Sequence, residues 1–190
     1  PAYRYVRGAE PPGPSRAEIL GGSLEGLRDG DILFVNGKAW RTKLVRLAEK
    51  SPPGFSHAGI LRFQEGVPRV IHASPEEGRV LAQSLEGFLA FENVDALRVY
   101  RLREGDRGEG ASRKALAYAL RDVPFDDRFD STDEGALYCT EVIWRAYEDV
   151  GVDLGAGGWV ELRNPVIRGK VLLPYGLSRS PLLTEVFAFP

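Results

Sequence analysis

Residues 56–73 read SHAGILRFQEGVPRVIHA, a pattern that indicates a β-sheet in the fold. Two runs rich in apolar residues, His57–Phe63 and Arg69–Ala73, flank a polar segment that contains a glycine. Short β-prone runs separated by such a segment are typical of two antiparallel strands joined by a turn. We therefore predict a β-hairpin that carries a histidine at one end of each strand.

The register of this hairpin decides whether the two histidines share a face of the sheet. If His57 pairs directly with His72, the turn is centred between Gln64 and Glu65, inside the polar segment. Directly paired residues of antiparallel strands have Cβ atoms about 5 Å apart. A slip of one residue would put the two rings on opposite faces. We expect the direct pairing.

Further elements are predicted on both sides of the hairpin. Strands are expected at 32–35 and 97–102, and helices at 16–20, 38–50, 112–121 and 138–150, with a loop-rich remainder to Pro190. Strands that precede helices favour an α+β fold with the helices on one side of a mainly antiparallel sheet.

The length and composition indicate a single globular domain. The chain has 190 residues, of which 43% are hydrophobic, which is enough to bury a substantial core and excludes general disorder. The proline-rich start predicts a leader or linker with a short helix over residues 1–27. Residues 28–190 are predicted to form the single domain.

Several functional classes are excluded by the composition. The 25 basic and 27 acidic residues leave a net charge of −2, which argues against a nucleic-acid binder. No apolar stretch approaches the ~20 residues of a membrane-spanning helix. A single cysteine excludes an internal disulfide. Because the chain lacks Met, we expect that any signal peptide has already been removed.

The single cysteine, Cys139, lies at the predicted start of a helix. Unpaired backbone N–H groups and the positive end of the helix dipole favour a thiolate there, and could also bind the oxyanion of an acyl intermediate. A buried structural cysteine is the alternative. Glu141, two residues on, is expected to point away from the thiol and to serve the helix dipole or a structural hydrogen bond.

Together, Cys139, His57 and His72 resemble a cysteine nucleophile with a base and an orienting group. One histidine would take the thiol proton while the other fixes its tautomer, and spacing alone leaves open which does which. The same three residues are also good zinc ligands, although a structural zinc site normally needs a fourth. We predict catalysis without a metal or other cofactor.

An ordered set of motifs resembles the YiiX-like cysteine hydrolases, the circularly permuted branch of the NlpC papain-like family. The motifs are Gly30-Asp31-Ile32-Leu33-Phe34, Phe55-Ser56-His57-Ala58-Gly59-Ile60, Val70-Ile71-His72-Ala73, Pro124-Phe125-Asp126, Tyr138-Cys139-Thr140-Glu141-Val142-Ile143-Trp144, Asn164-Pro165-Val166 and Tyr175-Gly176. The resemblance implies a papain-like fold in which the sheet precedes the nucleophile helix. It also implies Cys139 as nucleophile and His57 as base, and places Tyr138 and Thr140 near the oxyanion and substrate.

The third polar position of the family falls on His72. YiiX-like members usually carry Glu there, whereas His is found in the related lecithin retinol acyltransferase-like branch. The resemblance implies an amidase or peptidase acting on cell-wall peptides or N-acyl compounds. A lipid acyl hydrolase or acyltransferase, and a non-catalytic metal-binding or ligand-binding module, are the alternatives. The resemblance further implies an extracytoplasmic location, and a cytoplasmic location is the alternative. The sequence makes no prediction about the oligomeric state.

Overall fold

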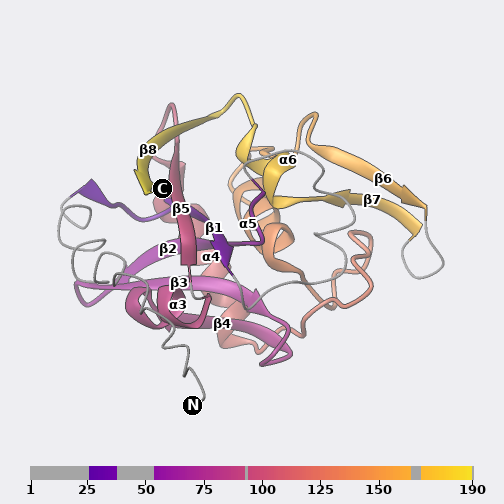
Figure 1. Cartoon of the computed structure of the whole chain (residues 1–190), viewed down its shortest axis with the longest axis horizontal. Helices are drawn as coiled ribbons and strands as arrows, with labels where there is room; N and C mark the ends of the chain where they lie inside the picture. The colour runs from indigo at the N-terminus through magenta and orange to yellow at the C-terminus, as the bar shows by residue number, and fades with distance from the viewer. Residues whose placement is uncertain (1–25, 38–53, 93, 164–167, 190) are drawn as a thin grey trace, which may run out of the picture.

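The computed structural model describes residues 26–37, 54–92, 94–163 and 168–189. The helices predicted at 16–20 and 38–50, and most of the predicted leader, lie outside these residues. Six strands form one sheet in the order β4-β3-β2-β1-β5-β8, and all neighbouring strands are antiparallel. They are β1 (Ile32–Gly37), β2 (His57–Gln64), β3 (Val67–Ser74), β4 (Arg79–Ser84), β5 (Val94–Leu102) and β8 (Leu183–Phe189). Figure 1 shows this sheet with the helices around it.

The predicted hairpin is formed by β2 and β3, but its register differs from the direct histidine pairing. Ile60 pairs with Ile71, and Gln64 pairs with Val67. The turn is therefore Glu65-Gly66, whose φ angles of 51° and 80° are both positive, as a two-residue type I′ turn requires. Each residue of β2 pairs with a residue of β3 two positions further along than predicted, so the predicted pairing was wrong. Because the shift is an even number of residues, His57 and His72 still lie on the same face of the sheet.

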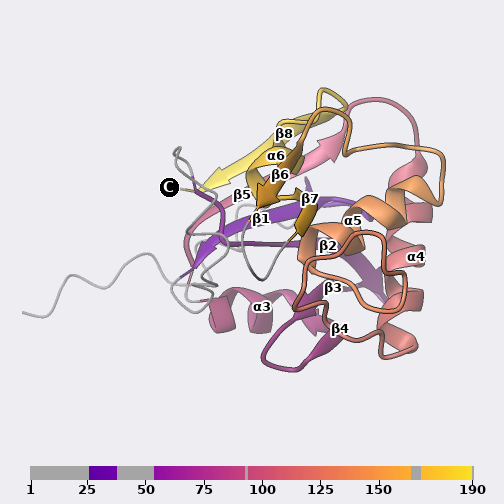
Figure 2. The ribbon, with the colours of Figure 1, turned by 90° about the vertical axis from the view of Figure 1, so that its right-hand side faces the viewer.

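Four helices and a second hairpin complete the described fold. The helices are α3 (Leu85–Glu92), α4 (Arg107–Leu120), α5 (Cys139–Glu148) and α6 (Pro174–Ser178), and the hairpin consists of β6 (Trp159–Arg163) and β7 (Arg168–Leu172). Figure 2 shows α4 and α5 on the side of the sheet away from α3. The helices thus cover both faces, and the prediction that they lie on one side was wrong.

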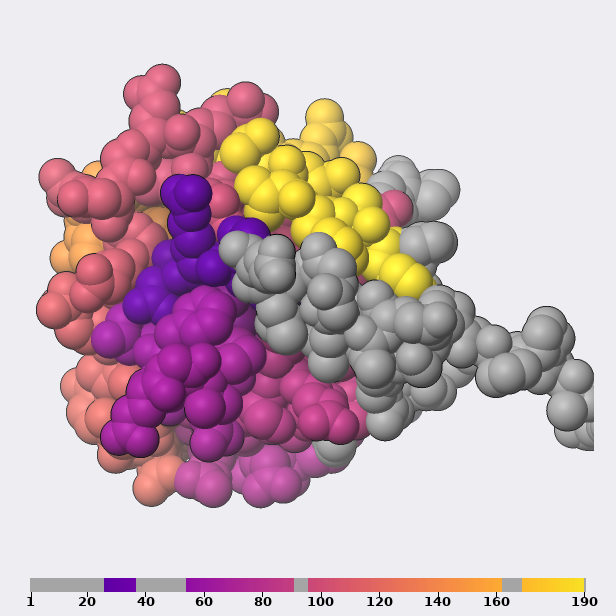
Figure 3. Space-filling view, turned by 90° about the vertical axis from the view of Figure 1, so that its left-hand side faces the viewer, coloured from indigo at the N-terminus to yellow at the C-terminus, as the bar shows by residue number. Residues whose placement is uncertain are grey.

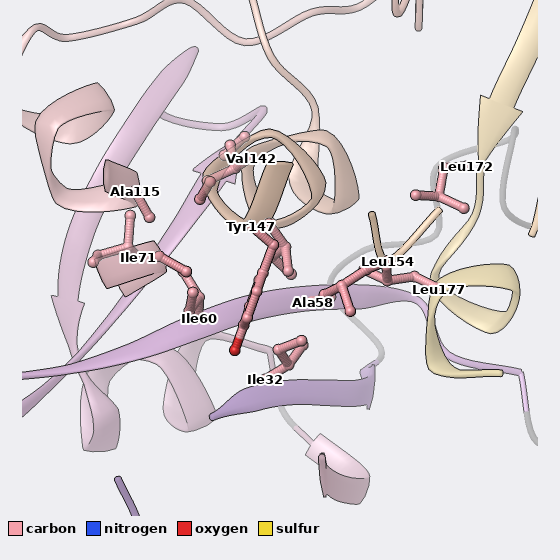
Figure 4. Packing of buried hydrophobic residues seen from close by; sticks show 14 of the residues in the cluster. Ile32, Ala58, Ile60, Ile71, Ala115, Val142, Tyr147, Leu154, Leu172 and Leu177 are labelled. Atoms are coloured by element: carbon pink, nitrogen blue, oxygen red, sulfur yellow. The ribbon is translucent and has the colours of Figure 1, made fainter. Parts of the chain in front are cut away.

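Alternation along the strands builds a separate core on each face of the sheet. One core joins residues such as Ile60 and Ile71 to α4 and α5, and Figure 4 shows Val142 and Tyr147 of α5 directed at these strands. The other joins the alternate residues, such as Leu61, to α3. Burying an apolar side chain contributes roughly 1.5–3 kcal/mol, so both faces hold the sheet in place.

A buried ion pair anchors the end of the sheet where β1 begins. Asp31 is fully buried, and Arg101 of β5 donates to both of its carboxylate oxygens at 2.7 Å. The hydroxyl of Tyr147 in α5 donates to the carbonyl oxygen of Gly30 at 2.6 Å. Arg101 also donates to the carbonyl oxygen of Gly26 and pairs with Thr184 near the start of β8, so the first described residues lie beside the start of β8, as the neighbouring indigo and yellow atoms in Figure 3 show.

Other predicted elements needed correction. Helix α4 begins at Arg107, not Ser112; Ser112 is buried inside the helix, where its hydroxyl donates to the carbonyl oxygen of Glu109. The C-terminal part, predicted as loop-rich, contains β6, β7, α6 and β8. Within the described ranges, the helices are all too short or too polar to cross a membrane.

Candidate active site

The two histidines meet on the face of the sheet that α3 covers. His57 is the first residue of β2 and His72 belongs to β3, and both are at most 2% exposed. Nε2 of His57 and Nδ1 of His72 are 2.9 Å apart, a hydrogen-bond distance. The rings are edge to face, with centroids 5.0 Å apart. The structure therefore joins the two predicted histidines through a diagonal contact between neighbouring strands.

A glycine makes room for this contact. Continuing the register of β2 and β3 by one residue puts Gly59 opposite His72. A Cβ atom at Gly59 would lie 2.4 Å from Cγ1 of Val70 and 3.4 Å from the Cβ of His72. The missing side chain allows β3 to lie close enough for the ring of His72 to reach His57.

Gln83 of β4 extends the hydrogen-bonded pair. Its Oε1 lies 3.1 Å from Nε2 of His72. Gln83 was not predicted from the sequence because β4 was not predicted, although the apolar run Val80-Leu81-Ala82 follows the turn residue Gly78. Val70 pairs with Gln83 and His72 with Leu81, so Gln83 lies on the same face as the histidines.

The surroundings of the pair keep both rings neutral at pH 7. Phe88 of α3 packs against both, with ring centroids 5.8 Å from His57 and 5.0 Å from His72. Burial, helped by the neighbouring His72, lowers the pKa of His57 well below 6.5. Burial also lowers the pKa of His72 to about 4, although the hydrogen bond that its Nε2 donates to Oε1 of Gln83 opposes this shift. A neutral imidazole can accept a proton, so each ring is in the state that a base requires.

Cys139 is the first residue of α5, as predicted, and is half-buried. The residue before the helix cap, Leu137, donates its N–H to the carbonyl oxygen of Pro124, and Pro124 bridges to Arg79 at the start of β4. Antiparallel pairing brings the start of β4 to the same end of the sheet as the start of β2, where His57 lies. Cys139 and the histidines thus lie at the same end of the sheet. Helix α5 packs against one face of the sheet, and the histidine rings lie on the opposite face.

The neighbours of Cys139 hold strand β7 with their side chains. The hydroxyl of Thr140 donates to the carbonyl oxygen of Leu172 at 2.5 Å, and the hydroxyl of Tyr138 accepts from the N–H of Leu172 at 3.2 Å. Both residues are almost completely buried. Tyr138 and Thr140 can therefore contribute only backbone N–H groups to an oxyanion site. The first N–H groups of a helix are suited to this because they have no acceptor within the helix.

Glu141 serves a structural hydrogen bond, as expected. It is completely buried, and Nε of Arg145, one turn further along α5, donates to its Oε1 at 2.8 Å. Burial raises the pKa of Glu141 to about 7, while the hydrogen bond and charge of Arg145 oppose the shift. The ion pair fixes the first turn of the helix that carries the thiol.

Comparison with known proteins gives these residues a context. Residues 26–162 match the family model of the permuted papain-like amidase enzymes, YaeF/YiiX, C92 family. The chain is 28% identical to the uncharacterized protein YiiX of Escherichia coli strain K12 over 153 residues, which cover 77% of this chain and 72% of that protein. It also resembles the crystal structure of a protein described as metalloprotein yiiX, from Escherichia coli O157:H7. That match has a TM-score of 0.72 and 23% identity, and covers 85% of this chain and 97% of the other.

Proposed function

Because the chain belongs to the family of permuted papain-like amidases, we propose that it is a cysteine hydrolase of amide or related acyl bonds. Cys139 is the nucleophile, His57 the general base, and His72 the group that orients His57. The observation that carries the proposal is the buried hydrogen bond between the two histidines, at the end of the sheet where α5 begins with Cys139. A base held by a second polar group is the arrangement that activates a thiol.

The proposed reaction has two steps. In the first, His57 takes the proton from Cys139, and Sγ attacks the carbonyl carbon of the substrate. The bond to the leaving nitrogen breaks, and that nitrogen receives the proton from His57, which leaves a thioester on Cys139. In the second, His57 takes a proton from water, whose oxygen attacks the thioester; the C–S bond breaks, and the sulfur regains the proton as the acid leaves. Backbone N–H groups at the start of α5 stabilise the oxyanion in both steps.

Small peptides, including those of the cell wall, N-acyl compounds and lipid-like acyl compounds are the proposed substrates, which fits an extracytoplasmic location. A second outcome keeps the same residues: transfer of the acyl group to an amine or alcohol, in the manner of the lecithin retinol acyltransferase-like branch. His72 favours this alternative, because that branch carries His at the third position. Product analysis with competing acceptors distinguishes the two, since hydrolysis gives only the free acid.

The single thiol makes the central test direct. A panel of amide and ester substrates is assayed with the unmodified protein, Cys139→Ala and His57→Ala, after circular dichroism has shown that the variants fold. We expect Cys139→Ala to abolish turnover and His57→Ala to lower kcat about 10²-fold to 10⁴-fold, the range that general-base catalysis contributes. Iodoacetamide should modify only Cys139, and this labelling should abolish turnover. Hydrolysis that survives in Cys139→Ala would refute the proposal.

A metal-dependent role fits these residues poorly, although a structural relative is described as a metalloprotein. In the ranges that the structure describes, three or more His, Cys, Asp or Glu side chains nowhere gather as a metal site. Two of the four ring nitrogens of His57 and His72 face each other, and a third faces Gln83. The proposed mechanism therefore uses no metal. Stoichiometric zinc whose removal abolished turnover would contradict this assignment.

A further inference from the structure

Three polar side chains form a continuous hydrogen-bonded chain across strands β4, β3 and β2. Oε1 of Gln83 lies 3.1 Å from Nε2 of His72, and Nδ1 of His72 lies 2.9 Å from Nε2 of His57. Each histidine thus uses a different nitrogen toward its neighbour. Such a chain has a direction, because each link needs one donor and one acceptor.

The direction follows from the chemistry of the first member. An amide oxygen only accepts, so the proton of neutral His72 must be on Nε2, and its Nδ1 carries the lone pair. That lone pair accepts, so the proton of neutral His57 is on Nε2. The lone pair of His57 is then on Nδ1, the nitrogen that faces away from His72. The oxygen of Gln83 thereby determines which nitrogen of His57 can act as a base.

We propose that Gln83 is a positioning residue that fixes the tautomers of both histidines, and so directs the lone pair of His57 onto Nδ1. Its effect on turnover rests on the proposed function, in which this lone pair takes the thiol proton. The effect of Gln83 on the tautomers does not depend on the proposed function, because the tautomers are a property of the protein without substrate.

The surroundings of Gln83 indicate a site built for its side chain. Helix α3 has a glycine, Gly87, inside its first turn, although glycine costs a helix interior about 1 kcal/mol relative to alanine. A Cβ atom there would lie 2.8 Å from Oγ of Ser84, 3.3 Å from Cγ of Gln83 and 3.4 Å from Nε2 of Gln83. Gly87 also donates its N–H to the hydroxyl of Ser84 at 3.0 Å, which ties the helix start to the residue after Gln83. The helix leaves the space that the amide occupies.

The test is ¹⁵N NMR of the imidazole nitrogens at pH 7.5, where both rings are neutral. The chain has only two histidines, so the four ring-nitrogen signals belong to His57 and His72. In the unmodified protein we expect the proton on Nε2 of both rings. A proton on Nδ1 of either ring would overturn the proposal without any variant.

Three substitutions then change the first link in different ways. Gln83→Glu keeps an acceptor and should keep both tautomers, with kcat within about 10-fold of the unmodified protein. Gln83→Lys offers only donors, so it should move the proton of each ring to Nδ1 and lower kcat about 10²-fold or more. Gln83→Leu offers neither and should give a mixture of tautomers.

The matched control is Gln64→Leu, because Gln64 is the other glutamine of the chain and ends β2 about 23 Å from His57 at the usual rise per residue. It should change neither tautomers nor kcat. Unchanged tautomers in Gln83→Leu and Gln83→Lys would overturn the proposal, even if kcat fell. Altered tautomers in a protein that hydrolyses no acyl substrate would support the role of Gln83 and refute the proposed function.

Discussion

The burial of His72 makes the stability of this protein depend on pH. Its pKa is about 4 in the folded chain and about 6.5 when the chain is unfolded. Above pH 6.5 the ring is neutral in both states. Between pH 6.5 and pH 4 the unfolded chain binds a proton that the folded chain does not, so the free energy of unfolding falls as the pH falls. At about 1.4 kcal/mol per pH unit, the loss over this range is about 3 kcal/mol.

Glu141 has an effect of opposite sign in nearly the same range. Its pKa is raised to about 7 in the folded chain, so between pH 7 and pH 4.5 the folded state binds the extra proton. This stabilises the protein by about 3 kcal/mol as the pH falls through that range. Glu141 thus opposes the two histidines, since the pKa of His57 is lowered as well, and the pH profile of the unmodified protein cannot isolate the contribution of any one of the three groups.

The decisive comparison is therefore between the unmodified protein and His72→Gln, which removes the titrating group. Urea unfolding followed by tryptophan fluorescence gives the free energy of unfolding of both at pH 7 and pH 4.5. The free energy of unfolding of His72→Gln, relative to that of the unmodified protein, should be about 2.5 kcal/mol higher at pH 4.5 than at pH 7. Glu141→Gln is the control. Because this variant lacks the opposing carboxyl, its free energy of unfolding should fall directly as the pH is lowered from 7 to 4.5. A difference that is the same at both pH values would refute the assignment of His72 as a buried neutral ring.

Three other substitutions test the frame around the site, each by urea unfolding. Gly59→Ala should cost roughly 1–3 kcal/mol through overpacking between β2 and β3, whereas Gly26→Ala, with open space around it, should cost less than about 1 kcal/mol. Asp31→Ala should cost about 3–5 kcal/mol because it leaves a partly buried arginine unpaired; Asp122→Ala, from an exposed pair, should cost at most about 1 kcal/mol. Thr140→Val should cost about 1–3 kcal/mol by leaving the buried Leu172 carbonyl oxygen without its donor. Equal costs within the Gly or Asp pair would contradict the described packing.

The sequence was sufficient for the hairpin, the shared face of His57 and His72, and the position of Cys139 at a helix start. These features follow from local patterns: apolar runs, a glycine-containing turn and a helix boundary. The exact pairing did not follow, because it depends on the backbone of the turn. Glu65 adopts a positive φ there, which residues other than glycine seldom do. The family of permuted papain-like amidases was also recognised from the order of the motifs, and the match over residues 26–162 confirms it.

Gln83 lay beyond such reasoning for a different reason. Its contact with His72 requires β4 to pair with β3 in one register and α3 to cover the same face. Neither condition is visible in a window of neighbouring residues, because both depend on contacts between separate elements. Similarly, β8 pairs with β5 from more than 80 positions away along the chain. Long-range pairing of this kind leaves only weak traces in a single sequence.

The path of α3 has a consequence for how water reaches the histidines. The helix starts directly after β4, at one edge of the sheet, and leads into β5, which pairs with β1 in its interior. It therefore crosses the face of the sheet with its start connected to β4 and its end connected to β5. The helix cannot move away from the sheet unless β4 or β5 separates from its neighbouring strand. The connectivity of the chain thus keeps α3 in place over the face of the sheet that carries the two rings. Hydrogen exchange at the backbone of α3 should accordingly be as slow as in the strands that flank it.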